Sequence, residues 1–131
     1  MAWDPALNTG VEEIDKQHMT LVAELEKFSE AITAQEGSSV LNSTLGFLES
    51  YVIDHFATEE EMHRNTNYPD FQHHKQIHEE LIQGLNELTG RIDEEGLTPE
   101  IANQTYRFLL NWAVEHISGE DMKFGAYYRS L

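Results

Sequence analysis

Hydrophobic residues recur along this chain in alternating steps of three and four positions, in four separate stretches. That period places them on one face of an α-helix, which then packs against a core. The stretches cover residues 11–32, 41–62, 71–92 and 101–116, and short connections join them. Helices connected in this way lie antiparallel to their neighbours. The pattern therefore predicts an all-α fold, an up-down-up-down antiparallel four-helix bundle.

Residues that start or stop helices separate the four stretches. Gly37-Ser38-Ser39 interrupts the pattern, and its serines can cap the helix that follows. Asn65–Pro69 is predicted to form a turn that places its proline at a first helical position. Thr98 is a predicted N-cap followed by Pro99, and Ser118-Gly119 is predicted to end the fourth helix.

The two ends of the chain add short pieces to the bundle. Met122–Leu131 carries Phe124, Tyr127 and Tyr128 at helical spacing, which predicts a short C-terminal helical segment across one end. Trp3 in an N-terminal arm is expected to pack there too. We expect one domain over residues 1–131, a length that buries about two thirds of the unfolded surface in a single core.

Six polar residues stand on the core faces of the predicted helices, where leucine would be expected. Histidine is only occasionally fully buried, so a set of this kind needs a physical cause, and the usual cause is a metal. The six residues are His18, His55, Glu59, His74, His78 and His116.

Spacing brings these residues together in pairs. Positions i and i+4 lie about 40° apart on a helix, so His55 projects with Glu59, and His74 projects with His78. Each pair is therefore predicted to serve one metal site.

A carboxylate near the end of the fourth helix completes the candidate set. Asp121 follows His116 by five positions, which on an α-helix would point it about 140° away. We expect the helix to break at Gly119, so that the backbone turns and brings Asp121 back inward.

Composition limits both the metal and the partners. The chain has no cysteine, so nitrogen and oxygen must hold any metal. Its net charge of −16 disfavours nucleic acid and anionic membrane surfaces as partners. The start lacks a basic region followed by an apolar run, and no apolar stretch approaches the roughly 20 residues that span a bilayer. We expect a cytoplasmic protein without membrane insertion.

The number of candidate ligands favours two metal ions over one. Five imidazoles and two carboxylates are too many for one ion, and they match two irons if Glu59 and Asp121 each bridge. With a shared solvent-derived oxygen, one six-coordinate iron would be saturated and the other would keep one open position. A small molecule could bind at that position.

Four segments, in order on the four predicted helices, resemble the hemerythrins, and in particular the single-domain bacteriohemerythrins. They are Ile14–His18, His55–Glu60, His74–His78, and Trp112 with His116 and Asp121. A single HxxxE or HxxxH motif is weak, but the four in this order are specific. The resemblance extends from about Trp3 to Tyr128.

The resemblance implies a centre of two non-haem irons with an oxo or hydroxo bridge. It implies reversible binding of dioxygen at the iron that two histidines hold, in an apolar pocket that keeps protons away. The implied ligands are His74, His78 and His116 for one iron, His18 and His55 for the other, and Glu59 and Asp121 as bridges. The implied pocket residues are Leu21, Phe56, Trp112, Ala113 and Ile117.

We interpret the chain as an oxygen carrier, store or supplier rather than an enzyme, with an oxygen-consuming enzyme as a candidate partner. Two alternatives stay open: an oxygen or redox sensor, and a di-iron enzyme acting on dioxygen, peroxide or nitric oxide. His63 is expected at the surface or behind the ligands, and His73 is expected at the surface, so both lie outside the ligand set. Glu60 is a candidate hydrogen-bond partner for a ligand imidazole.

Overall fold

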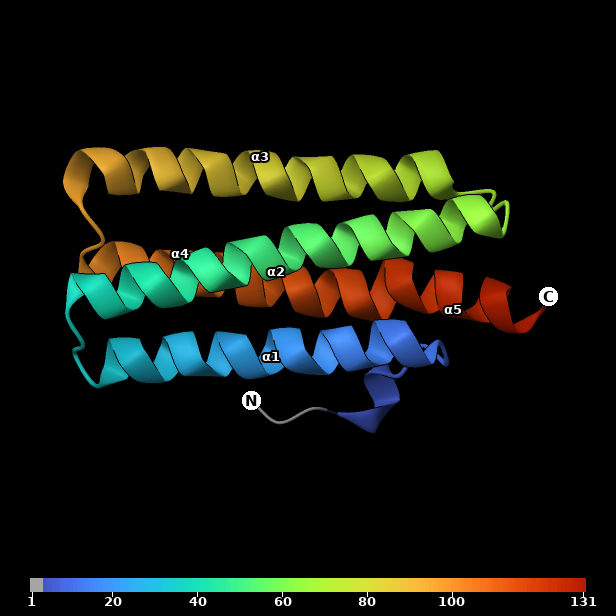
Figure 1. Cartoon of the computed structure of the whole chain (residues 1–131), viewed down its shortest axis with the longest axis horizontal. Coiled ribbons are helices and arrows are strands. Elements are labelled where there is room, and N and C mark those ends of the chain that lie inside the picture. The colour runs from blue at the N-terminus through green and yellow to red at the C-terminus, as the bar shows by residue number, and fades with distance from the viewer. Residues whose placement is uncertain (1–3) are drawn as a thin grey trace.

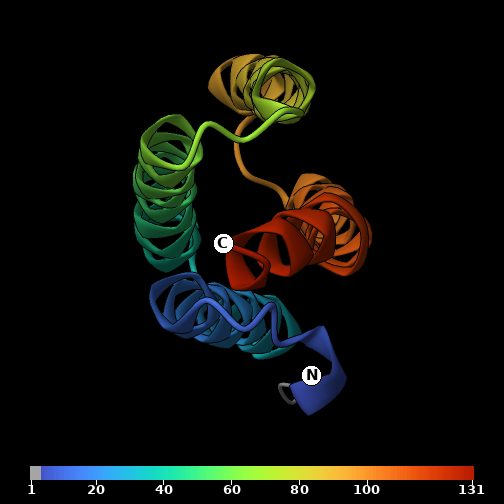
Figure 2. The same ribbon diagram turned by 90° about the vertical axis from the view of Figure 1, so that its right-hand side faces the viewer.

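Four long helices lie side by side and alternate in direction, as the computed structural model shows for residues 4–131 (Figure 1). Seen from one end, they surround a common core (Figure 2), with α1 and α3 each packed against both α2 and α4. The prediction of an all-α antiparallel bundle is therefore confirmed. Trp3 lies outside the described residues. The elements are η1 Pro5–Leu7, α1 Glu12–Thr33, α2 Ser38–Asn65, α3 Phe71–Glu95, α4 Pro99–His116, η2 Ile117–Asp121 and α5 Met122–Arg129.

The helix boundaries follow local chemistry, with two departures from expectation. The Thr98 side chain accepts a hydrogen bond from the Ile101 amide at 3.2 Å, and Pro99 opens α4, both as predicted. Gly37 rather than a serine is the N-cap residue of α2. Pro69 lies in the turn before α3 instead of inside its first turn. Neither departure moves a core position.

The predicted core faces of α1, α2 and α3 are buried at most positions and partly buried near the helix ends, but the buried face of α4 is rotated. Leu109 and Ala113 are buried, at 3% exposure each. Phe108 and Trp112, which successive steps of three and four from Thr105 would place on the core face, are only partly buried. A helix of 3.6 residues per turn allows a step of three or four, and here α4 takes the longer step. Phe108 lies instead against α3, where a Cβ on Gly84 would come within 2.6 Å of its ring.

The C-terminal segment closes one end of the bundle, as predicted. Phe124 of α5 is fully buried in a cluster with Val11, Ile14 and Tyr68. The backbone of α5 approaches the N-terminal arm so closely that a Cβ on Gly125 would collide with the backbone oxygen of Thr9. This end of the bundle is therefore held by residues far apart in sequence.

Asp15 anchors the same arm. Its carboxylate accepts hydrogen bonds from the amide and hydroxyl of Thr9, each at 2.8 Å, and from the amide of Gly10 at 3.1 Å. Because three donors satisfy it, this carboxylate can be buried beside the core.

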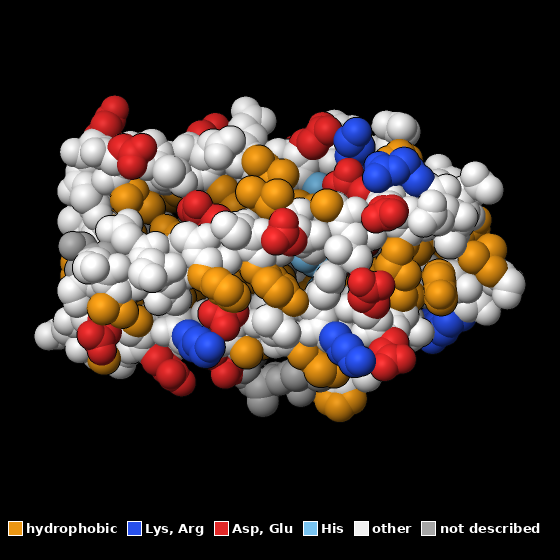
Figure 3. Space-filling model, viewed as in Figure 1, with side chains coloured by type: hydrophobic (Ala, Val, Ile, Leu, Met, Phe, Trp, Pro, Cys, Tyr) orange, Lys and Arg blue, Asp and Glu red, His pale blue; other side chains and the backbone are white. Residues whose placement is uncertain are grey.

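The face of the molecule shown in Figure 3 carries no single dominant acidic patch. Acidic side chains are scattered over the face shown in Figure 3, between apolar ones and a few basic ones. Among residues 4–131, no helix is both long enough and apolar enough to cross a membrane.

Candidate metal centre

The seven predicted ligands come from every long helix and meet inside the bundle. His18 lies on α1, His55 and Glu59 on α2, and His74 and His78 on α3, while His116 ends α4 and Asp121 ends η2. All seven are buried, and the most exposed of them, His116, is only 5% accessible. The helical spacing read from the sequence therefore brings six of the seven together, and Asp121 joins them from the end of η2.

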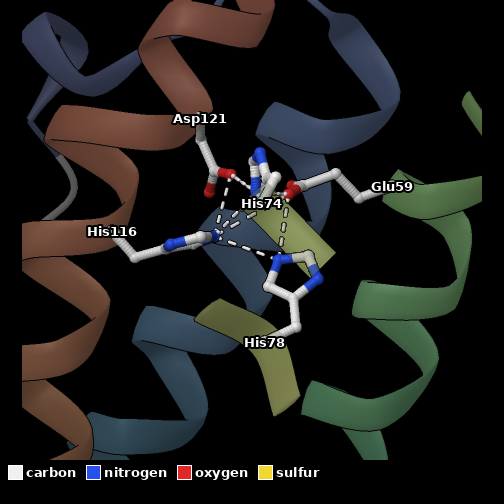
Figure 4. Close-up of side chains that lie close together, drawn as sticks. All are labelled: Glu59, His74, His78, His116 and Asp121. Carbon is white, nitrogen blue, oxygen red and sulfur yellow. Dashed lines mark hydrogen bonds and ion pairs between the residues drawn. The ribbon is translucent and has the colours of Figure 1, made fainter. Parts of the chain in front are cut away.

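One half of the site contains three imidazoles (Figure 4). Nε2 of His116 lies 3.0 Å from Nε2 of His74 and 3.1 Å from Nε2 of His78. Oδ1 of Asp121 lies 3.0 Å from Nε2 of His74 and 3.1 Å from that of His116. Oε1 of Glu59 lies 2.5 Å from Nε2 of His74 and 3.2 Å from that of His78. Five side chains thus direct nitrogen or oxygen atoms at one another.

The other half contains two imidazoles and uses the remaining oxygens of the same carboxylates. Oδ2 of Asp121 lies 3.0 Å from Nε2 of His18. Oε2 of Glu59 lies 3.3 Å from Nε2 of His55 and 4.0 Å from that of His18. In each half, the candidate ligand atoms all lie within 4.8 Å of one another. Glu59 and Asp121 therefore face both halves, one oxygen to each.

Asp121 reaches the site through a π-helical turn, and the predicted helix break is wrong. The chain continues from α4 through the π-helical η2, Ile117–Asp121, directly into α5. A π turn bonds residues five apart and so places Asp121 near the face of His116. Gly119 has no positive φ, and a Cβ there would meet no atom within 4 Å. The glycine is not needed for the turn.

Two ligand candidates are oriented by hydrogen bonds to their outer ring nitrogens. Nδ1 of His55 lies 2.6 Å from Oε1 of Gln17, and Nδ1 of His78 lies 2.9 Å from Oε2 of Glu60. With Nδ1 donating, the lone pair of each ring is on the Nε2 that faces the site. The candidate role of Glu60 agrees with this contact. The role of Gln17 was missed, although it lies next to His18 in the segment that resembles the hemerythrins.

His63 and His73 differ from each other. His73 is exposed, consistent with the surface position expected for it. Its Nε2 lies 3.7 Å from Oε1 of Glu120. His63 is completely buried, so a surface position for it is wrong. Its ring centroid lies 4.5 Å from that of His74, directly behind the candidate ligands. The predicted core face of α2 ended at Met62, but the structure buries His63, one position further on, and leaves Met62 only partly buried.

Apolar side chains surround the candidate ligands. Phe56 stacks on His78 with ring centroids 3.8 Å apart and planes 6° apart. Trp112 stacks on His116 at 4.4 Å and 18°. Ile117 is buried in the core. Both stacked rings and the core packing limit the access of water to the site.

Three of the five predicted pocket residues line a small apolar cavity of about 10 Å³, room for about one water-sized molecule. Phe56 and Ile117 do not line it. The lining residues are Leu21, Leu25, Leu48, Val52, Leu81, Leu109, Trp112 and Ala113.

Electrostatics couples the carboxylates to the imidazoles. Burial alone would lower the pKa of His74 and His116, but contacts with Asp121 and Glu59 outweigh it and raise each pKa to about 9. Burial would raise the pKa of Glu59 and Asp121, but contacts with the imidazoles hold both pKa values well below the ordinary range. Without a metal, protons therefore supply the positive charge that the buried carboxylates need.

Atoms without hydrogen-bond partners gather at the centre of this site. Among the described residues, Nε2 of His55 and both carboxylate oxygens of Glu59 and Asp121 make no hydrogen bond of good geometry, although each lies close to a polar atom of the same cluster. Buried polar atoms are rarely left in this state. Imidazole nitrogen and carboxylate oxygen are ligands that iron accepts. The residues present thus form a cluster able to hold metal, and they fit two cations that share the carboxylates.

Comparison with known proteins agrees with a cation-binding domain. The sequence profile of the Hemerythrin HHE cation binding domain matches residues 9–128. The chain belongs to the hemerythrin family. This hemerythrin is 28% identical to the bacteriohemerythrin of Stenotrophomonas maltophilia, over 95% of this chain and 78% of that protein. It is 28% identical to the myohemerythrin of Theromyzon tessulatum and 30% identical to a hemerythrin-like protein of Naegleria gruberi, over 93% of this chain and 88% of each relative.

Family membership supports a di-iron, oxygen-binding domain. Hemerythrins bind non-haem di-iron and dioxygen, and they are mainly oxygen binders rather than enzymes.

Proposed function

We propose that this hemerythrin holds two iron ions and binds dioxygen reversibly, as a carrier, store or local supplier of oxygen. One observation carries the proposal: two groups of buried ligand atoms, with three and two imidazoles, share the two carboxylates of Glu59 and Asp121. In this proposal His74, His78 and His116 hold one iron, and His18 and His55 hold the other.

The unequal division supports a binding position beside His18 and His55. Both carboxylates face both halves of the site, so the half with two imidazoles offers one ligand fewer. Two ferrous ions supply the electrons for reversible dioxygen binding when they occupy the site. The protein's part is to leave room on the side of His18 and His55 while filling the other side with His74, His78 and His116.

The surrounding residues favour reversible binding over oxidation chemistry. Gln17 and Glu60 hold His55 and His78 with their lone pairs toward the site. Phe56 and Trp112 cover the imidazoles on which they stack, and the adjoining cavity has only apolar walls. A dry surrounding withholds the protons that would release reduced oxygen species. An oxygen-consuming enzyme is the natural recipient of oxygen from such a protein.

Oxygen titration of the anaerobically reduced protein tests the proposal. We expect two irons and one dioxygen bound per chain, with an absorption band that disappears when oxygen is removed. Irreversible oxidation at the first exposure would instead favour a di-iron enzyme. Failure to retain two irons would contradict the ligand assignment itself.

A further inference from the structure

His63 is a buried imidazole that the proposed ligand set does not use. It lies on α2, one helical turn after Glu59, and its exposure is 0%. Neither of its ring nitrogens has a hydrogen-bond partner among the described residues. Leaving both polar atoms of a buried ring without partners is unfavourable. A leucine, methionine or phenylalanine at this position would avoid that cost.

Most of the surroundings of His63 offer it nothing polar. Its ring centroid lies 4.4 Å from that of Phe124 and 5.9 Å from that of Phe71. The polar neighbours among its ring contacts are Tyr68, at 5.0 Å, and His74, at 4.5 Å. In a pocket walled by aromatic rings the imidazole is neutral, so one ring nitrogen carries a proton and the other can accept a hydrogen bond.

His74 also has a ring nitrogen without a hydrogen-bond partner among the described residues. Its Nε2 faces Glu59 and Asp121, but its Nδ1 has no hydrogen-bond partner among the described residues. The equivalent Nδ1 atoms of His55 and His78 do have partners. A histidine that binds metal almost always donates its other ring N–H to a neighbouring group. His74 therefore lacks an acceptor that its proposed role requires.

The two imidazoles are close enough to satisfy each other. Their planes lie at 53° with the centroids 4.5 Å apart, so rotation of the His63 ring about its Cβ–Cγ bond can turn one of its nitrogens toward Nδ1 of His74 while Nε2 of His74 stays at the site. This torsion is soft in histidine. We propose that His63 is a positioning residue of the metal site, whose neutral imidazole accepts a hydrogen bond from Nδ1–H of His74 when Nε2 of His74 binds iron. This inference rests on the proposed di-iron function.

Three variants test the inference: His63→Met, His63→Gln and Tyr68→Phe. Methionine fills the space without accepting a strong hydrogen bond, and glutamine retains an acceptor. Tyr68→Phe removes the hydroxyl of the other polar neighbour of His63. Each protein is loaded with Fe²⁺ without oxygen, and iron affinity is measured by competition with a chelator. The reduction potential of the centre and the unfolding midpoint of the metal-free protein are measured alongside.

We expect His63→Met to bind iron roughly 10- to 100-fold more weakly, the usual loss when such an outer partner is removed. Its reduction potential should rise, because His74 becomes a weaker donor to the oxidised iron. The metal-free variant should be at least as stable as the wild type, because two unpartnered atoms are removed. His63→Gln should restore most of the affinity, and Tyr68→Phe should leave it unchanged.

Three results would overturn the inference. His63→Met could bind iron with unchanged affinity and potential, or His63→Gln could be impaired as much as His63→Met. Tyr68→Phe could also reproduce the loss, which would make the tyrosine the partner of His63. If the wild type itself fails to load two irons, the proposed function falls and this inference falls with it. Loading of the wild type therefore separates the two failures.

Discussion

Nε2 of His116 lies 3.1 Å from Oδ1 of Asp121, although an α-helix would place residues five positions apart about 140° from each other. The π turn of Ile117–Asp121 removes this angular mismatch without interrupting the chain. The last carboxylate of the site thus depends on a change of helical pitch at the junction of α4 and α5.

Gly119→Ala tests whether the turn needs a glycine. The backbone there is helical and a Cβ would meet no atom within 4 Å, so iron binding should be unchanged. Alanine should raise the free energy of unfolding by about 0.5–1 kcal/mol, since it loses less backbone entropy on folding. Iron content per chain and urea denaturation check the two expectations. Loss of iron from this variant would show that Asp121 is positioned by a glycine-dependent bend after all.

Glu60→Ala tests the hydrogen bond to His78. Removing the carboxylate 2.9 Å from Nδ1 of His78 should weaken iron binding by roughly 10- to 100-fold. Glu61→Ala is the matched control, because this neighbour is exposed and its loss changes the net charge equally. Chelator competition measures both affinities. Equal effects of the two variants would assign the loss to charge and not to the hydrogen bond.

The stability of the metal-free protein should be highest near pH 6.5. His74 and His116 have a pKa of about 9 in the folded protein, above the ordinary 6.5, so their stabilisation is complete below pH 6.5 and is lost as the pH rises through 9. Burial, helped by the neighbouring His74, lowers the pKa of His63 to about 4, so stability also falls as the pH drops from 6.5 toward 4. Glu59 and Asp121, whose pKa values are lowered, add a further loss below about pH 4.5.

Urea midpoints of the chelator-treated protein at pH 5, 6.5 and 8.5 measure this profile. A midpoint that rises steadily from pH 5 to pH 8.5 would show that His74 and His116 are not paired with the carboxylates in the metal-free state.

His74→Leu tests whether metal compensates for a polar core. Leucine restores the apolar stripe of α3, so the variant should remain helical by circular dichroism. Iron at about 100 times its dissociation constant should raise the free energy of unfolding of the wild type by about 2.7 kcal/mol. It should raise that of the variant much less. Thermal unfolding with iron and with chelator measures the difference. Equal stability of the wild type in the two conditions would remove the argument that the histidines are buried for a metal.

The helical period predicted the bundle and the ligand cluster because both depend on which residues share a face. Each imidazole replaces an apolar residue at a step of three or four, so the burial of His18 or His78 could be read directly from the sequence. The same rule could not decide between steps of three and four. It therefore left open whether His63 lies at the surface or behind the ligands, and it placed Phe108 and Trp112 too deep in the core.

The hydrophobic period of one helix does not predict which of its side chains contact a neighbouring helix. Gln17 meets His55 across the interface of α1 and α2, and its own helix gives no reason for that contact. The π turn could not be predicted either. Two ligands five positions apart, as His116 and Asp121 are, can reach one site through a helix break or through a wider turn. Packing against neighbouring elements decides between them.

Repeated oxygenation tests the central claim most directly. The protein is loaded with two irons per chain, reduced without oxygen, and taken through successive cycles of oxygen addition and removal while its absorption spectrum is recorded. The account predicts a charge-transfer band that forms with one dioxygen per chain and returns with undiminished amplitude over many cycles. A band that fails to return after the first cycle, with oxygen consumed, would contradict reversible binding at this site.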